Sequence, residues 1–76
     1  MPSNATIVEV EATSSGSIAL GAQYIGIYNT GTADGTFNGA KVPAGSSKCY
    51  SAPVQKVFNA LNYDATGTTL LITAIY

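Results

Sequence analysis

Alternating apolar and polar residues predict short β-strands along most of the chain. Residues 6–12 place two valines on one side of an extended backbone and two glutamates on the other, which is the period of a half-buried strand. Ser17–Leu20 repeats the pattern, with Ile18 and Leu20 on one face. A third strand is predicted over Gln23–Asn29.

The predicted strand Gln23–Asn29 has one aliphatic face and one aromatic face. Ile25 and Ile27 share one side, and the opposite side carries a glycine, Gly26, between Tyr24 and Tyr28. A glycine in a strand often marks a close approach of another group. We therefore expect a flat spot here, with a neighbouring backbone or aromatic ring lying over it.

Residues 28–45, YNTGTADGTFNGAKVPAG, are rich in turn residues. Asn29–Gly31, Asp34–Gly35 and Asn38–Gly39 are turn signals, because glycine tolerates positive φ and Asn or Asp bonds its own backbone. Val42–Gly45 fits a β-turn with its proline in the second position and its glycine in the fourth. We interpret the stretch as turns and not as a ligand-binding loop.

Short strands separate these turns. Thr36–Asn38, with Phe37 as its apolar anchor, and Ala40–Val42 are expected to form two successive hairpins with the extended segment Ser46–Ala52. The single cysteine, Cys49, has no internal disulfide partner. Because free cysteines are usually buried, we expect it to be a small hydrophobe packed in this strand beside Tyr50, with an intermolecular bridge as the alternative.

Residues 54–61 are ambiguous between helix and strand. Their apolar residues Val54, Val57, Phe58 and Leu61 are spaced i, i+3, i+4 and i+7, as on one face of a helix. Eight residues are few for a helix, and Val, Phe and Asn are poor helix formers. We expect a strand or an extended segment, with one or two helical turns as the alternative.

The C-terminal strand is apolar on both faces. After a turn at Asp64–Gly67, residues 68–76 place Leu70, Ile72 and Ala74 on one side and Leu71 and Ile75 on the other. A strand buried on both faces lies centrally in a sheet or between its own sheet and another subunit. About seven short strands in total predict one all-β domain over residues 1–76, a small antiparallel β-sandwich or barrel with one short helical turn as an option near 54–61.

The composition excludes several classes of protein. The chain is 46% hydrophobic and only 9% charged, whereas an average soluble domain is about 25% charged, so disorder is not expected. No apolar run approaches the roughly 20 residues of a membrane span, and no secretory signal is visible at the N-terminus. Three scattered lysines and a net charge of −1 argue against a nucleic-acid partner. We expect no membrane insertion.

The chain has little material for catalysis or for cofactor binding. It has no histidine, one cysteine and four carboxylates, so we expect no enzyme, no cofactor and no catalytic residue. Asp34 and Asp64 could each contribute to a calcium site. Because neither lies in a dense carboxylate loop, we expect both to form turns instead.

Surface association is expected to involve the tyrosines and the last strand. The candidate interface residues are Tyr24, Tyr28, Tyr50, Tyr63, Leu71, Ile75 and Tyr76. Tyrosine is common at subunit interfaces, although the same rings could form a sugar-stacking platform. Small domains bury little core, and few lysines are present to protect sheet edges. We therefore expect a homo-oligomer, with a trimer as one option.

Two segments, IYNTGTADGTFNGAKVPAG and LNYDATGTTLLI, resemble small β-rich proteins encoded among bacteriophage virion genes. Those proteins share an N-x-G turn, a short strand ending in Asn-Gly, a Pro/Gly turn and a terminal YDATGT strand. The likeness, which begins in the strand Gln23–Asn29, covers about two thirds of the chain. It implies a structural virion protein, a minor capsid, decoration, spike or tail component, which docks on other virion proteins and has no active site. The alternative is a carbohydrate- or receptor-binding β module.

Overall fold

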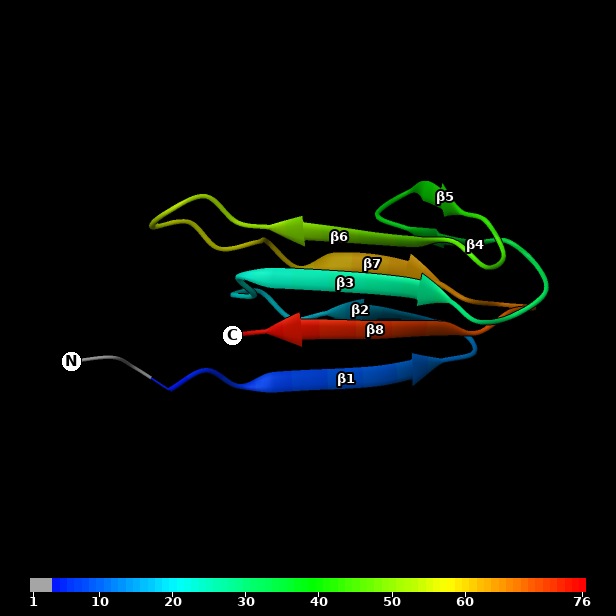
Figure 1. The fold of residues 1–76 in the computed structure, drawn as a ribbon, viewed down its shortest axis with the longest axis horizontal. Coiled ribbons are helices and arrows are strands. Elements are labelled where there is room, and N and C mark those ends of the chain that lie inside the picture. The colour runs from blue at the N-terminus through cyan, green and yellow to red at the C-terminus, as the bar shows by residue number, and fades with distance from the viewer. Residues whose placement is uncertain (1–3) are drawn as a thin grey trace.

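The computed structural model describes residues 4–76 as two four-stranded antiparallel sheets packed face to face (Figure 1). Sheet A has the strand order β1-β8-β3-β6, and sheet B has the order β2-β7-β4-β5. The strands are β1 (Ile7–Ala12), β2 (Ser15–Ile18), β3 (Tyr24–Asn29), β4 (Gly35–Phe37), β5 (Ala40–Val42), β6 (Ser47–Ser51), β7 (Leu61–Asp64) and β8 (Leu70–Ile75). The prediction of a small all-β sandwich is confirmed, with eight strands instead of about seven.

Nearly every connection carries the chain from one sheet to the other. Among strands that are consecutive in sequence, only β4 and β5 pair with each other. The other ladders join distant segments, as in β1 and β8, where Val8 pairs with Ala74 and Val10 with Ile72. Each sheet is therefore assembled from both halves of the chain.

The apolar faces predicted from alternation meet between the two sheets. Sheet A contributes Ile25, Ile27, Leu70, Ile72 and Ala74, and sheet B contributes Ile18, Phe37 and Val42; all of these are buried. The face assignments for β3 and β8 are confirmed. β8 lies between β1 and β3, as expected for a strand that is apolar on both sides, but among residues 4–76 no strand covers its outer side.

The turn predictions succeed at one hairpin and fail at the next. Asn38 and Gly39 have φ of 52° and 81° and join β4 to β5, which is the expected Asn-Gly hairpin. The predicted second hairpin is wrong, because β5 and β6 belong to different sheets. The turn is also displaced by one residue: Ser46 N–H donates to Pro43 O at 3.0 Å, so Gly45 takes the third position, where its φ of 76° requires glycine.

The ambiguous segment 54–61 is not helical. It contains a turn at Val54–Gln55 and an extended run that ends where β7 begins, so the extended interpretation is confirmed. Phe58 N–H donates to Ala22 O at 2.8 Å, and Gly21 N–H donates to Phe58 O at 3.0 Å. These two bonds hold Phe58 against the core, whereas Val54 and Val57 are exposed, so the helical spacing of the apolar residues does not mark a buried face.

The second strand differs from its prediction at both ends. It begins two residues earlier than expected, at Ser15, and ends at Ile18. Leu20 lies beyond the strand and is exposed, so the prediction that it shares a strand face with Ile18 is wrong. The chain turns at residues 20–21 because Gly21, with φ of 112°, redirects it toward sheet A.

Candidate functional site

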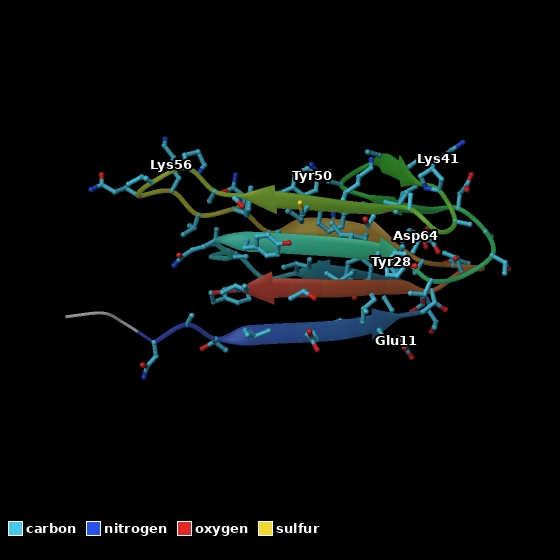
Figure 2. The ribbon with its side chains drawn as sticks, viewed as in Figure 1. Glu11, Tyr28, Lys41, Tyr50, Lys56 and Asp64 are labelled. Atoms are coloured by element: carbon cyan, nitrogen blue, oxygen red, sulfur yellow. The ribbon has the colours of Figure 1, made fainter. Side chains whose placement is uncertain are left out.

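The outer side of sheet A carries several exposed apolar and aromatic side chains, among them Ile7, Tyr28 and Leu71. The registers place its outward residues in three rows: Ile7, Ile75, Tyr24 and Ser51; Glu9, Thr73, Gly26 and Cys49; Glu11, Leu71, Tyr28 and Ser47. We call these twelve residues the tyrosine face. Figure 2 shows Tyr28 on β3 and Glu11 on β1 near the same end of the sheet.

The two outer faces of the sandwich differ in polarity. On the tyrosine face, Tyr28 is 47% and Leu71 39% exposed, and Ile7 is also exposed. The outer side of sheet B carries instead Ser15, Ser17, Thr36, Lys41, Asn62 and Asp64. Of the two outer sheet faces described by residues 4–76, the tyrosine face is therefore the one suited to bury further apolar surface.

Four of the seven candidate interface residues lie together on this face: Tyr24, Tyr28, Leu71 and Ile75. The other three point into the sandwich or close its end. Tyr50 stacks on Phe37 with ring centroids 6.1 Å apart. Tyr63 covers Gly16, and the hydroxyl of Tyr76 donates to Ala19 O at 2.8 Å. Alternation alone could not assign these three, because their strands are short and pair with distant segments.

A shallow groove crosses the middle of the tyrosine face. Its floor is formed by the small residues of the second row, Gly26, Thr73 and Cys49, and Tyr24 and Tyr28 stand on either side of Gly26. The groove has a volume of about 340 Å³. The predicted flat spot is present, and the ring that lies close is that of Tyr24: a Cβ atom on Gly26 would be 3.4 Å from it.

Cys49 is exposed on β6, so the expectation of a buried cysteine is wrong. It pairs with Gly26 and shares the outer side of the sheet. Alternation in β6 turns Tyr50 inward, and Cys49 must then point outward. An intermolecular bridge through Cys49 stays a prediction.

The two aspartates do not share a site, and only Asp64 forms the expected turn. The predicted turn at Asp34–Gly35 is wrong, because Asp34 lies directly before β4, whose first residue is Gly35. Asp64 Oδ1 accepts a hydrogen bond from Thr66 N–H at 2.9 Å, and hydrogen bonding by Thr66 holds the pKa of Asp64 below its ordinary value of 3.8. Asp34 instead approaches Lys41 at 3.7 Å on the surface. Within residues 4–76 there is no cluster of three or more potential metal ligands, and no helix is long and apolar enough to cross a membrane.

The Asp64 turn predicts a small pH dependence of stability. Because the folded pKa is lowered, the ionised carboxylate stabilises the fold above pH 3.8, and this contribution is lost as the pH falls through the folded pKa. Asp64→Asn keeps the acceptor oxygen but has no charge to titrate. We expect denaturant titrations at pH 6 and pH 2.5 to show a smaller pH effect in Asp64→Asn than in the wild type.

Asn29 is a buried polar centre that sequence reasoning treated only as a turn residue. Its Nδ2 donates to Ala33 O at 2.8 Å and to Val42 O at 2.9 Å. Its Oδ1 accepts from Gly31 N–H at 2.9 Å and from the Thr68 hydroxyl at 2.8 Å. One signal could have revealed it: Asn29 shares the inward side of β3 with two buried isoleucines.

The tyrosine face can bury apolar surface and stack aromatic rings, and it offers hydroxyl, thiol and carboxylate groups beside its groove. In comparisons with known proteins, the chain matches no protein-family model, no curated protein and no solved structure.

Proposed function

We propose that this protein is a non-catalytic structural component of a virion, a minor capsid, decoration, spike or tail protein. It self-associates and docks through the tyrosine face onto a lattice of other virion proteins. The observation that carries the docking part is the exposed apolar surface around Tyr28 and Leu71, opposite a polar outer sheet. The resemblance of the turn and C-terminal segments to phage virion proteins supports the location.

The chemistry of the tyrosine face favours a protein partner. The buried centres of protein interfaces are enriched in aromatic residues and depleted of charge. On this face the charged residues, Glu9 and Glu11, are confined to the edge strand β1, and the central strands β3 and β8 carry Tyr28, Leu71 and Ile75. Docking would therefore cover the apolar centre and leave the carboxylates at the rim.

Particle incorporation tests the proposal. Particles released by the cells that encode the chain are purified on a density gradient, and the chain is quantified by immunoblot. Leu71→Lys and Tyr28→Lys should each reduce incorporation by about tenfold or more, because truncating or charging an interface centre costs roughly 1.4 kcal/mol or more. Thr36→Lys, on the outer side of sheet B, is the matched control and should incorporate normally.

Two outcomes would contradict the virion assignment: absence of the wild-type chain from the particles, or normal incorporation of both tyrosine-face variants. A carbohydrate- or receptor-binding module is the second candidate, because Tyr24 and Tyr28 flank a groove that Thr73 helps to line. In that case, soluble oligosaccharides should shift the ring resonances of Tyr24 and Tyr28 in NMR titrations. The ring of Tyr63, which is partly buried against the core and away from the groove, serves as the internal control.

A further inference from the structure

The two sheets are offset, so that β1 overhangs sheet B. In Figure 1, β2 lies behind the space between β3 and β8, and among residues 4–76 no strand lies behind β1. Val8 and Val10 face the inner side of sheet A, in register with Ala74 and Ile72. They are nevertheless 41% and 36% exposed, unlike the inward residues of the central strands. We call Val8 and Val10 the β1 ledge.

An open groove of about 240 Å³ runs beneath the ledge. Its apolar lining comes from Val8, Val10, Ile18, Ile72, Ala74 and Tyr76. The strands on either side each have one free edge, since β1 pairs only with β8 and β2 only with β7 within residues 4–76. Unpaired strand edges beside an apolar groove invite another strand.

We infer that the occupant of this groove is the same ledge of a second copy of the chain, in a closed two-fold dimer. The inference rests on the self-association part of the proposed function and names the surface that makes it. The two-fold axis runs parallel to the strands and midway between the two sheets. The rotation places sheet B of the second copy in the same layer as sheet A of the first copy. Sheet B of the second copy therefore continues sheet A of the first.

Strand directions permit this joint. β1 and β2 run in opposite directions (Figure 1), and rotation about an axis parallel to the strands preserves those directions. β2 of the second copy therefore lies antiparallel to β1 of the first, and the reverse pair forms in the other layer. Both free edges are paired at once, and Val8 and Val10 of the two copies pack against each other across the axis.

The side chains brought together are compatible. On the outer surface, Glu9 and Glu11 of β1 come beside the Ser15 and Ser17 side of β2, whose hydroxyls can donate to carboxylates. Pairing β1 with β1 in a single layer is the competing arrangement. In this arrangement, registers that align five residues of each β1 place Glu9 opposite Glu9 or Glu11 of the other copy, and the like charges repel. The β1 ledge of each copy also stays uncovered.

The opposite edge of the sandwich, formed by β5 and β6, is protected against edge-to-edge pairing with another copy. β5 is only three residues long and carries Lys41, which Figure 2 shows at that end, and Pro43 follows directly after it. Lys48 on β6 faces inward, because it pairs with Ile27. In a head-to-tail joint between β6 and β1, Lys48 would lie beside the valines. The contact is therefore expected to close as a dimer and not to extend into a filament.

Solution mass and hydrogen exchange test the dimer. Sedimentation velocity of the wild type at micromolar concentration should give twice the chain mass of 7.7 kDa. Val10→Lys should give a folded monomer. The position is partly exposed in the single chain, so a lysine there stays hydrated, whereas the dimer would bury its charge. Leu71→Lys places the same charge on the tyrosine face and should remain a dimer.

Hydrogen exchange distinguishes the possible dimers. The proposed joint protects alternate amides on both β1 and β2, and Val10→Lys should lose protection in both strands. A dimer protected on β1 alone, a wild-type monomer, a polymer that grows with concentration, or a dimer unaffected by Val10→Lys would each overturn the inference. If Val10→Lys fails to fold by circular dichroism, Val8→Thr takes its place with the same expectations. A wild-type monomer that still incorporates into particles through Leu71 would refute this joint and leave the docking proposal intact.

Discussion

Asn29→Ala is expected to lower the free energy of unfolding by about 3 kcal/mol, because it removes a fully buried amide that makes four hydrogen bonds. The carbonyls of Ala33 and Val42 and the hydroxyl of Thr68 would be left without this partner, and each unsatisfied buried group costs about 1–3 kcal/mol. Small domains have a total stability of only about 5–15 kcal/mol. Urea denaturation followed by circular dichroism would measure the loss.

Two neighbouring substitutions calibrate the Asn29 result. Thr68→Val preserves the shape of the side chain and removes one of the four bonds, so we expect a loss of about 1 kcal/mol. Thr30→Ala changes an exposed residue next to Asn29 and should stay within about 0.5 kcal/mol of the wild type. A loss below about 1 kcal/mol for Asn29→Ala would show that the network is not an organising centre of the fold.

Gly31→Ala is expected to destabilise the protein by about 2–3 kcal/mol through steric overlap. A Cβ atom at this position would overlap the Thr68 hydroxyl and lie 2.7 Å from the Thr69 backbone nitrogen. The side chain of Thr68 could rotate only by giving up its bond to Asn29, and the backbone of Thr69 leads directly into β8. Thermal and urea denaturation should both detect the loss.

The matched control for Gly31→Ala lies in the same loop. Thr32→Ala changes an exposed side chain one residue later and should leave the stability within about 0.5 kcal/mol of the wild type. Equal stability of Gly31→Ala and Thr32→Ala would mean that the loop between β3 and β4 can move away from the β7–β8 turn, contrary to the tight contact described above.

Periodicity predicted the inward faces of β3 and β8 because each strand alternates over six residues and one side of each contacts the core. The general tendency of free cysteines to be buried gave the wrong prediction for Cys49, and turn residues gave the wrong prediction for the second hairpin. β6 is a five-residue edge strand, and neither of its faces is apolar enough to define the register. Such a strand can turn either side toward the core. Whether a turn closes a hairpin or crosses between sheets depends on where the next strand finds its partner, and here that partner is distant in sequence.

The grouping of candidate site residues was predictable only in part. Tyr24 and Tyr28 share a face by spacing alone, and the sequence placed Leu71 and Ile75 on one side of the last strand. Nothing local indicated that β8 pairs with β3, which brings the two pairs together. The exposure of the β1 ledge could not be predicted either. Val8 and Val10 alternate with polar residues like ordinary core residues, and only the pairing of the strands leaves them uncovered.

Composition and alternation by themselves determined that this chain forms a low-charge, all-β domain whose glycines and asparagines mark its turns. These properties follow from the backbone preferences and hydrophobicity of each residue and its near neighbours. The tertiary structure alone decided which strands pair, that Asn29 organises a buried network, and that sheet A carries both the tyrosine face and the uncovered ledge. Those outcomes depend on contacts between segments up to about seventy residues apart, such as Ile7 with Ile75, whose energies no local pattern encodes.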